Sequence, residues 1–285
     1  MTNQTLPISS PVGLVAGGGV LPFAVAEALA SRSIPAVFFA LKGFCDPEQV
    51  ARFRHHWISL GQLGRLTRLL RAENCRDLAF IGTLIRPALS EIRLDWGTLR
   101  AFGSVLAAFR GGDDHLLSGI GRILEHDGFR MVGIMDLAPE LLMPAGGLTR
   151  SVPDADANAD IAKGRALLQA LGPFDVGQAV VVIDGHVVGV EGVEGTDALL
   201  ARVAQLRSDG RIRAKVGRGV LVKAPKQGQD LRFDLPTTGL RTVEGAIAAG
   251  LAGVAAVAGY SIVADPQPMI EAADRAGVFV TGLPA

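Results

Sequence analysis

Apolar and polar positions follow two periods along the first half of the chain. Short apolar runs predict buried strands at residues 12–16, 35–40, 57–60, 78–81 and 131–135. Between them, apolar residues at helical spacing predict helices at about 23–30, 63–70 and 116–124. Strands that alternate with helices form βαβ units with right-handed crossovers. The first half is therefore predicted to be a Rossmann-like parallel sheet flanked by helices.

The pattern changes between residues 139 and 160, where prolines and glycines are frequent. Such a composition is typical of a linker or an exposed loop. The length of 285 residues also favours two domains over one. We therefore expect an N-terminal α/β domain at 1–145, with a glycine-rich turn, and a C-terminal α/β domain at 146–285, with the acidic motifs.

The second half mixes hairpin and helix signals. Asp184-Gly185 separates two runs of β-branched residues, which is a strong signal for a type I′ hairpin. Thr196 or Asp197 is the expected N-cap of the helix that follows. This pattern predicts a mixed α/β domain with the following elements: helices at 159–171, 196–207 and from 242, and strands at 179–183, 186–190, 220–223 and near 254, 262 and 279.

One uncharged stretch, residues 245–264, approaches the length of a bilayer span. It is rich in Ala and Gly, and Gly250, Gly253 and Gly259 interrupt it, so we interpret it as a buried helix followed by strands. The N-terminus lacks a basic region followed by an apolar core, so no signal peptide is predicted. These features favour a cytoplasmic protein.

The composition excludes several function classes. The net charge is zero and the pI is near 7, which argues against a nucleic-acid-binding protein. Cys45 and Cys75 are the only cysteines and lack C-x-x-C spacing, as expected of a reduced cytosolic protein. The five histidines are too scattered for a zinc site, and no Walker or G-x-S-x-G motif is present.

An acidic segment near the C-terminus, residues 229–236, is the strongest candidate for a site. If the segment is extended, Asp230, Arg232 and Asp234 share one face, and Leu231, Phe233 and Leu235 the other. Two carboxylates on one face repel each other unless a cation holds them. Carboxylate oxygens favour a hard cation. Asp230 and Asp234 are therefore candidate metal ligands or catalytic groups.

Three further segments carry weaker signals in the first half. Gly17, Gly18 and Gly19 lie between the first strand and the first helix, where backbone N–H groups attract phosphate, although Pro22 replaces the third glycine of a dinucleotide fingerprint. A tight structural turn is the alternative. Asp113 and Asp114 either cap a helix or face a ligand. Arg86, which follows the fourth predicted strand, either binds phosphate or is solvated.

A second acidic cluster contains Glu191, Glu194 and Asp197, separated by glycines. Tight acidic turns can bind Mg²⁺, and acids at a helix N-terminus are also favoured by the helix dipole alone. The cluster follows a predicted strand of the same expected domain as Asp230 and Asp234. We therefore count its three acids as supporting metal ligands.

Six motifs occur in order along the chain: VGLVAGGGVLP (12–22), GDDHLL (112–117), Gly177-Gln178, EGVEGTD (191–197), GVLVK (219–223) and QDLRFDLP (229–236). Taken together, they resemble one family over about residues 12–282. The family is the metal-dependent UDP-2,3-diacylglucosamine diphosphatases of lipid A biosynthesis, the type unrelated to the calcineurin-like enzymes. One departure is the segment Thr83–Pro87, where a Lys is expected between the glycine and the Arg-Pro pair.

The resemblance implies hydrolysis of UDP-2,3-diacylglucosamine to UMP and 2,3-diacylglucosamine 1-phosphate, with Mg²⁺ or, as a substitute, Mn²⁺, and with the substrate between two domains. It implies a lipid-linked UDP-sugar as the partner and contact with the inner face of the inner membrane. A homodimer is left open. We therefore expect Asp230 to be the first candidate for metal ligand or base and Asp234 the second. The expected roles by residue are as follows: Asp230, Asp234 and Arg232 in catalysis, and Gly17, Gly18, Gly19, Arg86, Asp113, Asp114, Gln178, Thr196 and Lys223 in substrate binding.

Two other functions remain open on the sequence. A nucleotide-cofactor oxidoreductase would use Gly17–Gly19, and bound cofactor would then be visible by absorbance or fluorescence. A non-catalytic module that binds a nucleotide sugar would bind ligand tightly without metal-dependent turnover.

Overall fold

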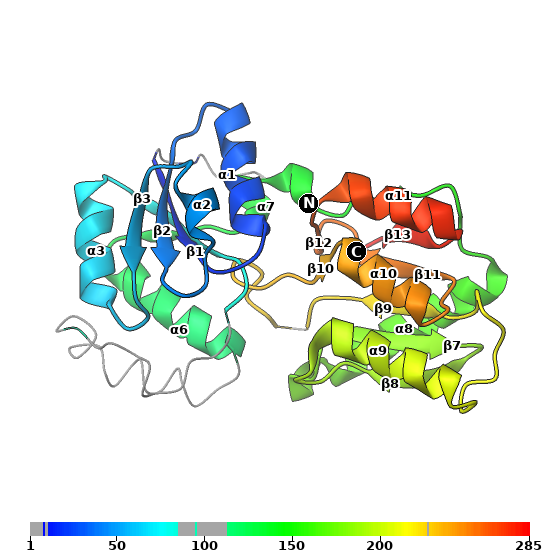
Figure 1. Cartoon of the computed structure of the whole chain (residues 1–285). Coiled ribbons are helices and arrows are strands. Elements are labelled where there is room, and N and C mark those ends of the chain that lie inside the picture. The colour runs from blue at the N-terminus through cyan, green and yellow to red at the C-terminus, as the bar shows by residue number, and fades with distance from the viewer. Residues whose placement is uncertain (1–7, 9–10, 85–94, 96–112, 227) are drawn as a thin grey trace. The chain divides into compact units, whose positions relative to one another are not determined.

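The computed structural model describes residue 8 and residues 11–84, 95, 113–226 and 228–285, with residues 113–116 described by their backbone only. The chain is an α/β protein that divides into two compact units (Figure 1). The first comprises Met1–Glu140 and Asp230–Asp234, and the second comprises Leu141–Gln229 and Leu235–Ala285. The α/β fold class is as the sequence predicts.

The first unit contains a parallel sheet of five strands in the order β3-β2-β1-β4-β5. This order reverses between β1 and β4, as in Rossmann-like folds, so the predicted sheet type is confirmed. The strands are β1 (Val12–Ala16), β2 (Ala36–Leu41), β3 (His55–Ile58), β4 (Asp77–Ile81) and β5 (Arg130–Met131).

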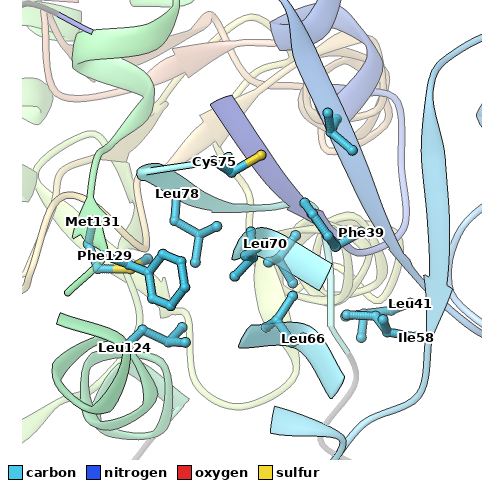
Figure 2. Close-up of a cluster of buried hydrophobic side chains, with 12 residues drawn as sticks. Phe39, Leu41, Ile58, Leu66, Leu70, Cys75, Leu78, Leu124, Phe129 and Met131 are labelled. Carbon is cyan, nitrogen blue, oxygen red and sulfur yellow. The ribbon is translucent and has the colours of Figure 1, made fainter. Parts of the chain in front are cut away.

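Helices cover both faces of this sheet. Phe39 of β2 belongs to a buried cluster with Leu70 and Leu124, shown in Figure 2. Its neighbour Phe38 points to the other face, where its ring lies 5.6 Å from that of Phe23. The helices are α1 (Leu21–Ser31), α2 (Pro47–Val50), α3 (Leu63–Ala72), α6 (Asp113–His126) and α7 (Ile134–Leu137).

The predicted strand at 131–135 is wrong beyond its first residue. The strand β5 ends at Met131, and α7 begins at Ile134. The Asp136 carboxylate accepts a hydrogen bond from the backbone N–H of Gly133 at 3.1 Å, and this contact closes the first turn of α7. A local helix start therefore overrides the apolar pattern.

The second unit contains a mixed sheet in the order β6-β13-β11-β9-β7-β8. Together with its helices, this sheet makes the mixed α/β domain that was predicted for this half. Its three central strands, β13, β11 and β9, are parallel, and the outer pairs are antiparallel. The strands are β6 (Gly146–Gly147), β7 (Ala179–Ile183), β8 (His186–Val190), β9 (Val220–Lys223), β11 (Gly253–Val257) and β13 (Phe279–Leu283), with a separate parallel pair, β10 (Thr237–Thr238) and β12 (Ile262–Val263).

Helices also cover both faces of the second sheet. Leu168 of one helix packs with Val180, and Leu200 of another packs with Val181, the next residue of β7. Residues 245–264 form the end of a helix, β11 and β12, and no helix among the described residues is long and apolar enough to cross a membrane. The helices are α8 (Ala155–Leu171), α9 (Gly195–Ser208), α10 (Leu240–Ala248) and α11 (Pro266–Ala276), with 3₁₀ turns η2 (Pro139–Leu141) and η3 (Gly172–Phe174).

The hairpin between β7 and β8 has the predicted turn chemistry. Asp184 and Gly185 both adopt positive φ, at 48° and 75°, as a type I′ turn requires. The buried carboxylate of Asp160, on α8, accepts hydrogen bonds from the backbone N–H groups of both residues, at 3.0 Å and 2.7 Å. This hairpin edge of the sheet is thus tied to α8.

Candidate functional site

The acidic segment Asp230–Asp234 packs with the first unit, although the sequence assigned it to the C-terminal domain. It is not extended as predicted. Leu231–Phe233 form a turn, closed by a hydrogen bond from Phe233 N–H to the Asp230 carbonyl oxygen at 3.0 Å. The expected alternation of a charged face and an apolar face is therefore replaced by a compact loop.

Two glycines of the first unit allow the loop to approach closely. A Cβ atom on Gly121 of α6 would overlap the ring of Phe233. A Cβ atom on Gly133 would lie 2.9 Å from the Cα atom of Arg232. The Phe233 ring also packs against Phe80 of β4, with ring centroids 5.9 Å apart. Phe233 thus anchors the loop beside the hydrophobic cluster of the first unit.

Arg232 of this loop binds two carboxylates, one from the loop itself and one from α6. Its Nε and Nη2 atoms donate to Oδ1 and Oδ2 of Asp230 at 2.9 Å and 2.7 Å, which is a bidentate pair. Its Nη1 atom donates to Oε1 of Glu125, on α6, at 2.6 Å. The hydrogen bonds from Arg232 hold the pKa of Asp230 below its ordinary value, so this carboxylate is ionised at neutral pH.

A second polar cluster lies in the second unit, where β9 ends. Lys223 is buried, and its Nζ atom donates to the Thr237 carbonyl oxygen at 2.6 Å and to Thr196 Oγ1 at 3.1 Å. The Thr196 hydroxyl in turn donates to Glu191 Oε1 at 2.6 Å. Glu191 is also buried and accepts from the backbone N–H of Gln178 at 2.6 Å. The chain of contacts joins a cation to an anion through one hydroxyl.

The remaining acids of this cluster have other partners. Glu194 accepts from Arg202 at 3.1 Å and from the backbone N–H of Gly192 at 3.1 Å. Asp197 pairs with Arg241. The helix α9 begins at Gly195 after Glu194, and no side chain caps it, so the predicted Thr196 or Asp197 cap is wrong. Thr196 instead donates to Glu191.

The glycine turn is built into the first sheet. The N–H groups of Gly17 and Gly18 donate to the carbonyl oxygens of Ile81 and Thr83, both at 2.8 Å. A Cβ atom on Gly17 would lie 2.6 Å from the Thr83 oxygen. These two N–H groups are therefore engaged within the protein, whereas Gly19 is exposed and adopts a φ of 90°. The packing explains Gly17 and Gly18 without a ligand.

Three of the predicted contacts cannot be located by their side chains. Arg86 lies outside the described residues. Asp113 and Asp114 are the first two residues of α6, and only their backbone is described, so neither the capping role nor the ligand contact is tested.

Neither cysteine has the character of a nucleophile. Cys75 is buried, and burial raises its pKa to about 11. Burial also raises the pKa of Cys45, whose thiol contacts the carbonyl oxygens of Ala16 and Gly17 at 2.9 Å and 3.1 Å. A thiolate is therefore disfavoured at both positions.

Within the described part of the chain, no group of three or more His, Cys, Asp or Glu side chains is arranged to hold a metal ion. The Asp230 carboxylate is instead bound by Arg232. The predicted ligands also divide between the two units, with Asp230 and Asp234 in the first and Glu191, Glu194 and Asp197 in the second.

Glu125, Gly121 and Gly133 are residues of this site that the sequence analysis missed. Gly121 and Glu125 are four positions apart and so lie on one face of α6. This spacing is the only feature of the sequence that relates the two residues. It does not identify them as site residues unless the loop that they contact, Asp230–Asp234, is also known.

Comparison with known proteins covers both units. The family description "LpxI N-terminal domain" matches residues 11–141, and "LpxI C-terminal domain" matches residues 144–281. The UDP-2,3-diacylglucosamine pyrophosphatase LpxI of Caulobacter vibrioides is 39% identical to the chain over 272 residues, which cover 95% of this chain and 97% of that protein. With both domain matches in order and this identity over nearly its full length, the chain belongs to the LpxI family.

Proposed function

We propose that this protein hydrolyses the diphosphate bond of UDP-2,3-diacylglucosamine, giving UMP and 2,3-diacylglucosamine 1-phosphate in lipid A biosynthesis. The observation that carries the proposal is the 39% identity, over almost the whole length of both chains, to a relative named for this substrate. A nucleotide-cofactor oxidoreductase is disfavoured, since the N–H groups of Gly17 and Gly18 are engaged by Ile81 and Thr83.

In this proposal the ionised carboxylate of Asp230 orients or deprotonates the attacking water. Its ionisation at neutral pH, maintained by Arg232, leaves it able to accept a hydrogen bond from that water. Asp234 is the second candidate in the same loop. Arg232 and Lys223 neutralise charge that develops on the phosphate oxygens, because a phosphoryl transfer depends mainly on positioning and charge stabilisation.

We also propose that the reaction uses Mg²⁺, or Mn²⁺ in its place. Mg²⁺ is often held by one or two carboxylates together with substrate phosphates, so a ready cluster of three acids is not required. Asp230 and Asp234 are the carboxylates that we propose, with Glu191, Glu194 and Asp197 in support. When bound, the ion would neutralise the diphosphate.

The test is an assay of the purified protein with UDP-2,3-diacylglucosamine, in which released UMP is quantified. We expect steady turnover with Mg²⁺, loss of nearly all turnover in EDTA, and recovery when Mg²⁺ is restored in excess. Full turnover in EDTA would refute the metal requirement alone. No UMP under any metal condition would refute the proposed reaction.

Because the substrate carries two acyl chains, we propose a cytoplasmic protein that contacts the inner leaflet transiently. No helix among the described residues could span the membrane, which is consistent with loose attachment. In cell fractionation, we expect salt or alkaline wash to release any membrane-bound protein. Release only by detergent would contradict this part of the proposal.

A further inference from the structure

The loop that carries Asp230 is held by contacts on one helix of the first unit. Gly121 and Glu125 lie one turn apart on α6, and they contact Phe233 and Arg232, which are consecutive residues of the loop. The helix itself is anchored by Leu124, which is fully buried in the core cluster that Figure 2 shows. Because α6 is held in the core, its contacts hold the loop in one position.

Each contact restrains a different part of the loop. The Phe233 ring fits where α6 lacks a side chain and packs against Phe80. The backbone at Arg232 approaches Gly133, at a distance that a Cβ atom there would prevent. Glu125 holds the outer end of the Arg232 guanidinium through Nη1. The same guanidinium also lies over the Phe233 ring, 5.3 Å from its centroid.

The remaining donors of Arg232 determine where the Asp230 carboxylate lies. A guanidinium is planar, so the position of Nη1 on Glu125 fixes the direction of Nε and Nη2. Those two atoms bind both oxygens of Asp230. The backbone N–H of Arg232 also donates to Asp230 Oδ1, at 3.1 Å. Glu125 of α6 thus orients the Arg232 guanidinium, and the guanidinium orients the Asp230 carboxylate.

We propose that Glu125 is a positioning residue, which orients the Asp230 carboxylate for the reaction by holding Arg232, and that Gly121 provides the seat for this loop. The inference rests on the proposed function, in which Asp230 acts on the substrate. Glu125 itself contacts neither water nor substrate in this role. Supporting residues of this kind typically contribute tenfold to a hundredfold to activity.

The first experiment compares Glu125→Gln with the wild type. The glutamine keeps the shape of the side chain but loses the charge that holds Arg232. We expect kcat to fall about tenfold, with KM changed less than about twofold, since the substrate-binding groups are untouched. Glu27→Gln is the matched control, because Glu27 of α1 pairs with Arg52 at 3.1 Å at an exposed position of the same unit. Its kcat should be unchanged.

A second readout follows the guanidinium itself without substrate. The Nε–H resonance of Arg232, assigned by its loss in Arg232→Lys, should be protected from solvent exchange in the wild type and in Glu27→Gln. In Glu125→Gln it should exchange faster. An unchanged resonance in folded Glu125→Gln would overturn the inference, and so would a changed resonance with unchanged kcat. If the wild type releases no UMP, the proposed function fails, while the resonance still decides whether Glu125 orients the pair.

Gly121→Ala separates positioning from stability. Alanine favours the helix more than glycine does, so α6 should be at least as stable, but its Cβ atom would displace the Phe233 ring. We expect kcat to fall about tenfold. The midpoint of urea unfolding should change little, because the gain in helix propensity opposes the clash with Phe233. A wild-type kcat in this variant would show that the contact between Gly121 and the Phe233 ring does not affect the reaction.

Discussion

Replacing Asp230 by asparagine is expected to lower turnover by at least about a hundredfold while the fold is retained. The variant keeps the size of the side chain and can still accept one hydrogen bond from Arg232. It loses the negative charge that a general base or a metal ligand needs. Because the ion pair is partly exposed, its loss should change the free energy of unfolding by less than about 1 kcal/mol. Steady-state assays and urea unfolding measure the two effects.

Asp156→Asn is the matched control for this variant. Asp156 pairs with Arg218 at 2.7 Å in the second unit, at an exposed position. Its loss should leave turnover within about twofold of the wild type, because a surface ion pair that takes no part in the reaction contributes little even to stability. If folded Asp230→Asn also kept turnover within about twofold, Asp230 would have no part in the reaction.

Replacing Lys223 by methionine is expected to reduce both turnover and stability. The methionine fills the space of the stem but removes the donor to Thr196 and to the Thr237 carbonyl oxygen. The buried Glu191 then lacks its nearby cation, and we expect a loss of about 3 kcal/mol in the free energy of unfolding. If Lys223 also stabilises phosphate charge, turnover should fall at least about a hundredfold.

A second change separates these two effects. Adding Glu191→Gln to Lys223→Met removes the unpaired charge and should restore part of the stability, but not the turnover. Lys163→Met is the control, because Lys163 also donates to a backbone carbonyl, that of Gly185, but is exposed. It should resemble the wild type in both measurements. Recovery of turnover in the double variant would show that Lys223 acts only through stability.

The sheets could be predicted because their strands carry local signals. The segments at 12–16 and 220–223 are buried on both faces, so a short apolar run was enough to locate β1 and β9. The hairpin turn was predictable from Asp184-Gly185 for the same reason, since its two positive φ angles are a property of the residues that adopt them. The error at 131–135 arose where Gly133 and Asp136 start a helix within an apolar run.

The candidate site was predictable in its residues but not in its arrangement. Alternating polar and apolar positions at 229–236 predicted an extended segment, whereas contacts with Gly121 and Gly133, about a hundred positions away, fold it into a turn. The contact between Arg232 and Glu125 likewise joins residues 107 positions apart. A pattern of nearby residues carries no information about such partners. The family resemblance, in contrast, depends only on the order of motifs, and the comparisons confirm it.

Phosphorus-31 NMR of the complete reaction tests the central claim, hydrolysis of the diphosphate bond of UDP-2,3-diacylglucosamine by this protein. The two coupled diphosphate signals of the substrate should disappear together. Two phosphomonoester signals should replace them in equal amounts, one from UMP and one from the 1-phosphate of the diacylated sugar. Diphosphate signals that persist with folded protein and Mg²⁺, or that shift to those of free UDP, would contradict the claim, because the P–O–P linkage would then be intact.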